Sequence, residues 1–264
     1  MGVPLTESQR QEAAERLAEA ERTRSPIDRL TDLYPGIGVA DAYDIQLRQI
    51  AAKRAAGAKV VGKKIGLTGK AIQQQFGVST PDYGHLMDYF PIPDGGEVTA
   101  SELIQPRVEP EIAFVLDKPL RGPGVNLAQV LAATRYVTPA FEIIDSRIKE
   151  WKFKYEDTVA DNGSSARFVL GSEQRAVDEL DLRLVGMVFK KNGEDIGNSA
   201  GAASLGNPAA AVAWLANALA EYGIGLEPGE VILPGALTKS FDAAPGDTFS
   251  ASYDGLGSVN VRFV

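Results

Sequence analysis

The chain has 264 residues and a formal net charge of −8, from 27 basic and 35 acidic side chains. This acidic balance disfavours non-specific binding to nucleic acid or to an anionic membrane surface, and no apolar run is long enough to span a bilayer. The absence of cysteine excludes disulfide frameworks, thiolate zinc sites and cysteine nucleophiles; together with a start unlike a signal peptide, it favours a cytoplasmic location.

Three segments are predicted to be helical, because they are rich in strong helix formers and carry suitable end signals. The first has Thr6 as its N-cap, the second ends at Gly57, and the third begins with Pro208. The apolar spacing of the third predicts a face packed in the core rather than a binding groove. These helices are predicted over residues 6–24, 39–58 and 208–223.

Many short β-like runs separate and follow these helices. The turn at Asn192-Gly193 is typical of a tight hairpin, because both residues accept positive φ. Strands dominate after residue 100 and do not alternate regularly with helices, so we predict an α+β fold rather than a doubly wound sheet. We expect an N-terminal helical segment, 1–75, packed on a β-rich body, 76–264, as a single folding unit. The runs are 59–67, 111–117, 136–145, 166–171, 182–196, 230–235, 247–255 and 257–264.

Two carboxylates, Glu109 and Glu111, directly precede an apolar run, and a third, Glu142, lies inside another. Residues two apart on a strand share a face, so the first pair points the same way. A buried ionised carboxylate needs a cation or a proton. Oxygen ligands without cysteine favour Mg²⁺, or Mn²⁺. Spacing alone leaves open that these acids are surface or salt-bridge residues.

Three basic residues are candidates for a role beside these acids. Lys63, Lys64 and Arg107 are candidates to offset the remaining negative charge or to bind an acidic substrate. The two lysines are adjacent, so only one points inward from a strand, and we expect the other to be solvated. The single histidine, His85, is more typical of a turn or packing residue than of a member of a catalytic triad.

Four blocks of the sequence resemble the 2-keto-4-pentenoate hydratase and 4-oxalocrotonate decarboxylase family, within the fumarylacetoacetate hydrolase superfamily. The likeness runs in order from about residue 25 to the C-terminus. It implies a mixed β-sandwich or roll with peripheral helices, assembly into a homo-oligomer, and a possible complex with a neighbouring pathway enzyme. The blocks are GKKIGLTGKAIQQQFGVSTPDYG, QPRVEPEIAFVLDKPLRGPG, FEIIDSRIKEWKFKYEDTVADNGSSARFVLG and GSVNVRFV.

The resemblance also implies roles for individual residues. It places metal-binding acids at Glu109, Glu111 and Glu142, an active-site lysine at Lys64 and an acid/base aspartate at Asp82. The ADNGSSARF block, with Ser164 and Ser165, resembles a part that helps line the substrate pocket. From the residues alone, Asp82 after a proline is more typical of a turn residue, and the two serines are equally typical of loop or cap residues.

The implied activity is metal-dependent hydration of 2-hydroxypenta-2,4-dienoate or a substituted analogue to a 4-hydroxy-2-oxo acid, in meta-cleavage degradation of aromatic compounds. Decarboxylation of 4-oxalocrotonate is the alternative, since it uses the same metal chelation. Acylpyruvate hydrolysis is less favoured, because His85 lies outside the region where such hydrolases carry a histidine. A non-catalytic partner subunit is also less favoured, because Lys64 and Asp82 are both present.

Overall fold

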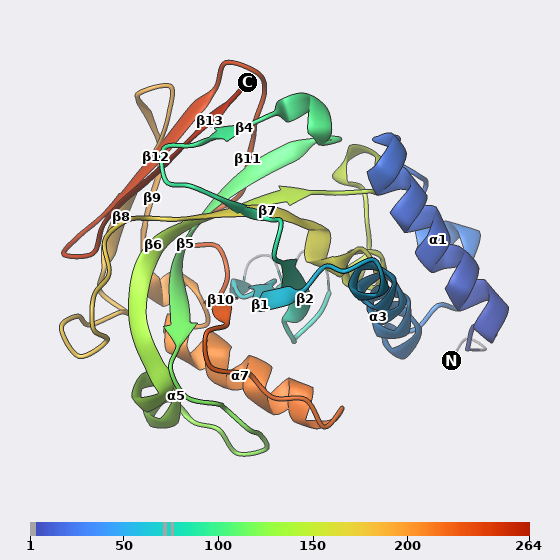
Figure 1. Ribbon diagram of the computed structural model, residues 1–264, viewed down its shortest axis with the longest axis horizontal. Coiled ribbons are helices and arrows are strands. Elements are labelled where there is room, and N and C mark those ends of the chain that lie inside the picture. The colour runs from blue at the N-terminus through green and yellow to red at the C-terminus, as the bar shows by residue number, and fades with distance from the viewer. Residues whose placement is uncertain (1–3, 71–72, 75–76) are drawn as a thin grey trace.

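The computed structural model describes residues 4–70, 73–74 and 77–264. Two β-sheets form the body and the N-terminal helices lie at one end of it (Figure 1). The α+β class and the sandwich-like body predicted from the sequence are confirmed. The helices are α1 Glu7–Thr23, α2 Leu30–Leu33, α3 Val39–Ala55, α5 Leu127–Ala133, α6 Tyr155–Ala160 and α7 Pro208–Ala220.

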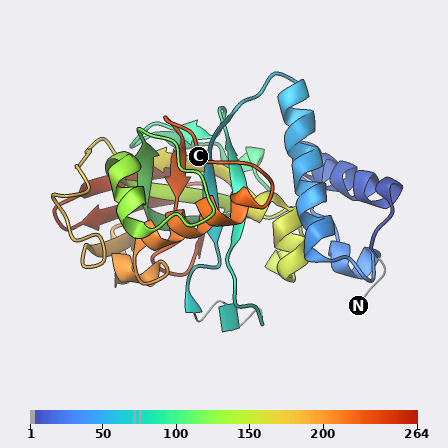
Figure 2. The same cartoon turned by 90° about the horizontal axis from the view of Figure 1, so that it is seen from below.

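The first helices form a separate layer beside the sheets, as the view from below shows (Figure 2). Helix α1 begins with the predicted cap. The Thr6 hydroxyl accepts a hydrogen bond from the Gln9 backbone amide, and the Thr6 backbone amide donates to the Gln9 side-chain oxygen. Asp41 lies in the first turn of α3, within the predicted second helix, and pairs with Arg10 at 3.1 Å. This ion pair joins α1 to α3.

The larger sheet holds eight strands within the described residues, in the order β2-β1-β10-β5-β6-β7-β3, with β11 added beside β5. Its longest pair is the antiparallel β5–β6, which keeps a regular register from Pro106 to Val115. The strands are β1 Val60–Gly66, β2 Asp82–Met87, β3 Pro91–Ile92, β5 Pro106–Leu116, β6 Thr134–Asp145, β7 Ser165–Leu170, β10 Val231–Leu233 and β11 Phe241–Asp242.

Strand β1 lies between β2 and β10, so residues 60–66 belong to the sheet and not to a helical segment. The predicted division at residue 75 therefore does not follow the architecture, in which the helical layer ends at Ala55. Strand β2 was not among the predicted runs. Its sequence, DYGHLM, follows a proline and reads as a turn, yet all six of its residues are buried.

The smaller sheet has the order β4-β13-β12-β8-β9. Asn192 and Gly193 both have positive φ, 54° and 84°, so the predicted hairpin joins β8 to β9. The two sheets meet through aromatic side chains, with the rings of Phe141 and Phe189 centred 5.5 Å apart. The strands are β4 Glu97–Val98, β8 Gly186–Lys191, β9 Glu194–Ala200, β12 Thr248–Tyr253 and β13 Gly257–Phe263.

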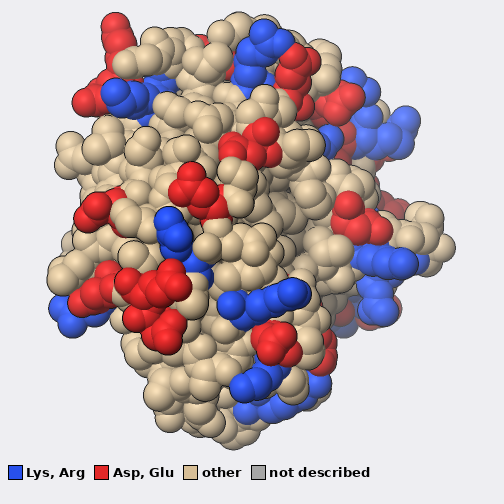
Figure 3. Space-filling model, turned by 60° about the vertical axis from the view of Figure 1, so that its left-hand side comes forward, with Lys and Arg blue, Asp and Glu red and all other residues tan. Residues whose placement is uncertain are grey.

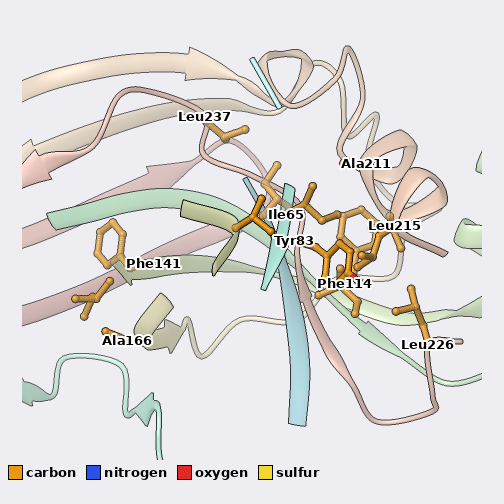
Figure 4. Packing of buried hydrophobic residues seen from close by; sticks show 14 of the residues in the cluster. Ile65, Tyr83, Phe114, Phe141, Ala166, Ala211, Leu215, Leu226 and Leu237 are labelled. Atoms are coloured by element: carbon orange, nitrogen blue, oxygen red, sulfur yellow. The ribbon is translucent and has the colours of Figure 1, made fainter. Parts of the chain in front are cut away.

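The hydrophobic core joins the sheets to helix α7. Figure 4 shows Ile65 of β1, Phe114 of β5 and Leu215 of α7 in this cluster. Val212, Leu215 and Leu219 are fully buried, which confirms the predicted core face of the third helix. The core therefore fixes β1, which carries Lys64, and β5, which carries Glu109 and Glu111.

The surface carries charges of both signs. On the face shown in Figure 3, Lys and Arg are interspersed with Asp and Glu among a larger uncharged area. None of the helices in the described part of the chain combines the length and the apolar character needed to cross a bilayer.

Candidate active site

Three glutamates meet on one face of the larger sheet. Glu109 and Glu142 are direct partners in the β5–β6 register, and Glu111 lies two residues further along β5 on the same face. One carboxylate oxygen from each lies within 4.8 Å of the others. The three side chains predicted from the sequence as metal ligands are therefore brought together.

The cluster is deeply buried and electrostatically unfavourable without a cation. Glu111 and Glu142 are fully buried, and each has an oxygen, Oε1, without a hydrogen-bond partner among the described residues. Burial, reinforced by the charge of Glu142, raises the pKa of Glu109 to about 7 and that of Glu111 well above its usual value. Orphaned carboxylate oxygens at this separation fit a hard divalent ion.

Backbone geometry supports this arrangement at Gly235. Its amide donates a 2.8 Å hydrogen bond to Glu111 Oε2. The residue has φ of +110°, and a Cβ there would lie 2.1 Å from the side-chain oxygen of Thr68. Only glycine meets both conditions, so the loop after β10 can reach the buried carboxylate.

Lys64 lies beside the acidic cluster. Its Nζ donates to Glu142 Oε2 at 2.7 Å, and the side chain is almost fully buried. Burial alone lowers the pKa of Lys64, but the negative charges of Glu142, Glu109 and Asp82 outweigh that effect and raise it overall. Lys64 is therefore a protonated cation at neutral pH.

Asp82 is the first residue of β2 and is 1% exposed, so it is not the exposed turn residue that the sequence alone left open. Burial, followed by the charge of Glu142, raises the pKa of Asp82, while Lys64 acts in the opposite direction. Its Oδ1 has no hydrogen-bond partner in the described part of the chain. A buried carboxyl group of this kind is suited to hold and transfer a proton.

A cavity of about 630 Å³ opens over these groups. Its inner part is bounded by Lys64, Asp82 and Glu109, and its walls are largely apolar. Such a site, apolar with a few convergent charged groups, is typical of small-molecule binding. Other lining residues include Leu67, Thr68, Ile144, Trp151, Phe153, Thr158, Ser164, Leu237 and Lys239.

Arg107 lines the same cavity, two residues before Glu109 on β5. Its guanidinium stacks on Trp151, with the carbon atom 4.5 Å from the ring centroid, and its Nε donates to Asp242 at 2.7 Å. The prediction of a cation beside the acidic cluster thus agrees with this geometry, although the role of Arg107 toward a substrate stays a prediction.

The two predicted serines occupy different positions. Ser164 lines the cavity and its hydroxyl donates to Asp161 Oδ2 at 3.0 Å. Asp161 in turn receives the buried side chain of Arg147, at 2.5 Å from Nε to Oδ1. Ser165 is buried at the start of β7 and is not part of the cavity lining.

Lys63 points to the opposite side of β1 from Lys64, as adjacent strand residues must. It lines a second cavity, which also contains its register partner His85. The prediction that Lys63 binds substrate in the glutamate site is therefore wrong, and so is the expectation that the outward lysine is solvated. Lys63 is 4% exposed and its Nζ lies 2.6 Å from the carboxylate of Glu230, which covers it.

Sequence reasoning missed several lining residues of the cavity. Trp151 ends the short 3₁₀ helix Lys149–Trp151, Phe153 lies two residues beyond it, and Lys239 lies in the loop after β10. The nearest signal was the DSRIKEWKFKYEDT stretch, where three aromatic residues lie among charged ones. No comparable pattern surrounds Lys239, because loop residues reach a site through tertiary packing alone.

Comparison with known proteins agrees with this geometry. The model of the fumarylacetoacetate (FAA) hydrolase C-terminal family matches residues 84–264. The chain is 48% identical to 4-oxalocrotonate decarboxylase from Pseudomonas sp. (strain CF600), with all of both chains covered. It is 47% identical to 2-hydroxyhexa-2,4-dienoate hydratase from Comamonas testosteroni, covering 94% of this chain and 95% of that protein.

A solved structure is also similar over nearly the whole chain. It is 4-oxalocrotonate decarboxylase from Pseudomonas putida G7, complexed with magnesium and adipate, with a TM-score of 0.96 and 46% identity. The alignment covers 98% of this chain and 99% of that one. The relatives named here are hydratases and decarboxylases, which are both lyases. The chain belongs to the fumarylacetoacetate hydrolase family, among its hydratases and decarboxylases of unsaturated 2-oxo acids.

Proposed function

We propose that this protein is a magnesium-dependent lyase that adds water to 2-hydroxypenta-2,4-dienoate or a substituted analogue, giving a 4-hydroxy-2-oxo acid. The observation that carries this proposal is the convergence of Glu109, Glu111 and Glu142, of which Glu109 lines a largely apolar cavity together with Lys64 and Asp82. Relatives that share 45% to 47% of the sequence are named hydratases of such dienoates. The proposed role is a step in meta-cleavage degradation of aromatic compounds.

The three glutamates would hold the divalent ion. When bound, the ion supplies Lewis-acid stabilisation of the negative charge that develops on the C2 oxygen of the substrate. Mg²⁺ is the expected ion, and Mn²⁺ is compatible with the same oxygen ligands. The structurally similar decarboxylase has been solved with magnesium and, separately, with calcium, both of which are hard ions.

Lys64 and Asp82 supply the charge and the protons. The Lys64 ammonium group faces the inner cavity and attracts the substrate carboxylate. Asp82, whose pKa is raised by burial, donates a proton to the terminal carbon of the dienol. The 2-hydroxyl proton leaves, water adds at C4, and a proton returned to C3 completes the 4-hydroxy-2-oxo acid. Atoms balance, with one water consumed.

Decarboxylation of 4-oxalocrotonate is the second candidate. The relative that is 48% identical over the full length carries that name, and so does the structure with a TM-score of 0.96. Both reactions pass through an enolate of a 2-oxo acid, so the same glutamates and Lys64 serve either one. Acylpyruvate hydrolysis lacks support in this site, because His85, the sole histidine, lies in the second cavity.

The test is a spectrophotometric assay of the purified protein with 2-hydroxypenta-2,4-dienoate, run with Mg²⁺ and after chelation. Loss of dienoate absorbance with Mg²⁺ and formation of the 4-hydroxy-2-oxo acid are expected. A parallel assay with 4-oxalocrotonate measures released carbon dioxide. Carbon dioxide release without hydration assigns the decarboxylase, whereas no turnover of either substrate contradicts lyase activity and favours a non-catalytic subunit.

A variant pair ties the activity to the cluster. Glu142→Gln keeps the shape of the side chain but removes a metal ligand and the ionic partner of Lys64, so it loses both Mg²⁺ binding and turnover. Glu194→Gln, an exposed change on β9, is the matched control and keeps both. Full activity of Glu142→Gln would refute the assignment. The homo-oligomer and a complex with a pathway enzyme stay predictions, testable by light scattering and co-purification.

A further inference from the structure

The backbone turn η3, Asn162–Ser164, contributes Gly163 and Ser164 to the wall of the active-site cavity. All three of its residues have positive φ, at 57°, 58° and 56°. This left-handed conformation costs conformational free energy at asparagine and serine, because both carry a side chain. Such a turn persists only where the surrounding structure holds it, so its contacts show which groups do so.

The side chain of Asn162 fastens this turn to strand β2. Its Oδ1 accepts a 2.7 Å hydrogen bond from the His85 backbone amide, and its Nδ2 donates to the His85 carbonyl at 2.9 Å. Strand β2 is the last strand at one end of the larger sheet and pairs with β1 on its other side. The buried Asn162 amide group therefore takes the place of a further strand and satisfies both backbone groups of His85.

The turn lies directly against the side chain of Lys64. A Cβ added to Gly163 would lie 2.8 Å from Lys64 Cε and 2.9 Å from its Cδ. The Gly163 backbone is therefore in contact with the flexible hydrocarbon part of the lysine. A lysine side chain has many rotamers in solution, and a wall at this position removes those that would occupy the same space. Lys64 Nζ is held in this way at 2.7 Å from Glu142 Oε2.

Other bonds hold the turn on its far side. The Ser164 hydroxyl donates to Asp161 Oδ2 at 3.0 Å, and Asp161 pairs with Arg147 in the segment after β6. These bonds tie the turn to the end of α6, whereas the Asn162 side chain ties it to β2. The fit against β2 is close, because a Cβ on Gly84 would lie 2.3 Å from the Asn162 carbonyl oxygen.

We propose that Asn162 is a positioning residue for the reaction, because it holds the left-handed turn against β2 and the turn holds Lys64 beside the acidic cluster. This inference rests on the proposed function and adds a residue to its machinery. Asn162 is not among the residues that line the cavity, whereas Gly163, Ser164 and Lys64 are. It therefore acts through Lys64 and does not contact the substrate.

The first measurement is turnover of 2-hydroxypenta-2,4-dienoate with Mg²⁺ by the variant Asn162→Gly. Glycine accepts the φ of 57° at this position, so the change removes the two bonds to His85 without adding backbone strain. We expect kcat/KM to fall about tenfold, because small displacements of a charged group that acts on the substrate are costly.

The chain offers a matched control at Asn217 on helix α7. Its side chain makes the same two bonds to the backbone of Val125, accepting from the amide at 2.8 Å and donating to the carbonyl at 2.9 Å. It does not line the cavity. Asn217→Ala removes this clamp at a helical position that suits alanine. We expect its kcat/KM to stay within about twofold of wild type, while urea denaturation compares the stability lost in the two variants.

The second measurement reports on Lys64 alone and needs neither metal nor substrate. The metal-free protein is acetylated with limiting acetic anhydride, and peptide mass spectrometry compares Lys64 with Lys63. The two lysines are 3% and 4% exposed and lie on opposite faces of β1, and the exposed Lys190 corrects for the reagent dose. We expect acetylation of Lys64 relative to Lys63 to rise at least threefold in Asn162→Gly and to stay unchanged in Asn217→Ala.

A second variant carries the test if Asn162→Gly does not fold. Asn162→Asp keeps an acceptor for the His85 amide and loses the donor to its carbonyl, so we expect a smaller fall in kcat/KM and a smaller rise in Lys64 acetylation. Aspartate also tolerates the left-handed conformation of this position.

The outcomes separate this proposal from the proposed function. An unchanged kcat/KM in the folded Asn162 variants, an equal fall in Asn217→Ala, or an equal rise in acetylation at Lys63 and Lys64 would overturn the positioning role. If the wild type turns over neither the dienoate nor 4-oxalocrotonate, the proposed function fails, and acetylation still decides whether Asn162 holds Lys64. A selective rise at Lys64 together with a selective loss of turnover supports the proposal.

Discussion

Replacing Glu109 by glutamine tests the electrostatics of the metal site directly. The three carboxylate oxygens lie within 4.8 Å of one another, so each pair of full charges repels by about 3.5 kcal/mol at an effective dielectric constant of about 20. Glu109→Gln removes two such pairs but also loses attraction to Lys64. We expect the metal-free variant to be more stable than the metal-free wild type by about 3 kcal/mol above neutral pH.

Metal binding nearly cancels that difference. With Mg²⁺ at about 100 times its dissociation constant, the wild type gains about 2.7 kcal/mol, and Glu109→Gln gains little because one ligand has lost its charge. Urea denaturation of both proteins, with chelator and with Mg²⁺, measures the four free energies of unfolding. Glu194→Gln serves as the control. A metal-free variant that is less stable than wild type, or one that keeps the full Mg²⁺ effect, would refute the reasoning.

Three further predictions concern the surroundings of the site. In Gly163→Ala the new Cβ would lie 2.8 Å from Lys64 Cε, on a residue whose φ is +58°. We expect kcat to fall at least tenfold and the free energy of unfolding to fall by about 1 kcal/mol. An unchanged kcat in steady-state kinetics would contradict this. Burial, and then a neighbouring lysine, lower the pKa of His85 from 6.5 to about 4. The unfolded chain binds this proton more tightly than the folded chain does. The free energy of unfolding therefore has its full value above pH 6.5 and falls by about 3 kcal/mol as the pH decreases toward 4. We expect His85→Asn to remove this decline when the free energy of unfolding is measured by urea denaturation across this pH range. The same dependence on pH in both proteins would refute the role of His85. Arg147→Met leaves Asp161 as a buried charge without an ionic partner, and we expect it to lower the free energy of unfolding, measured by urea denaturation, by about 3 to 5 kcal/mol. A loss below about 1 kcal/mol would argue against the ion pair.

Much of the acidic site could be predicted from the sequence, because strand alternation puts Glu109 and Glu111 on one face whatever the rest of the fold. The placement of Glu142 opposite Glu109 could not be derived in this way. It depends on a register between strands 33 residues apart in the chain (142 − 109), set by packing across the whole sheet. The family resemblance supplied that pairing, and the structure agrees with it.

The two wrong predictions, at Lys63 and at the strand beginning with Asp82, also arise because tertiary packing decides these positions. Lys63 lies outside the site because β1 is an interior strand with a covered second face, where Glu230 replaces solvent as its partner. The strand at Asp82 was not predicted, because a proline followed by aspartate, with a glycine two residues later, favours a turn when only sequence neighbours are considered. Its burial comes from α3 and η3, Asn162–Ser164, which pack against it; for example, Gln46 donates to the Tyr83 carbonyl and the Asn162 side chain bonds the His85 backbone.

The in-register pairing of Glu109 with Glu142 has a consequence for how the protein matures. A slip of one residue between β5 and β6 would turn Glu142 toward the opposite side of the sheet and leave no three-oxygen site. Correct strand alignment must therefore precede metal loading, and a chain aligned wrongly gains nothing from the ion. In cells with ample magnesium, the ion would thus stabilise only those chains in which β5 and β6 pair in the native register.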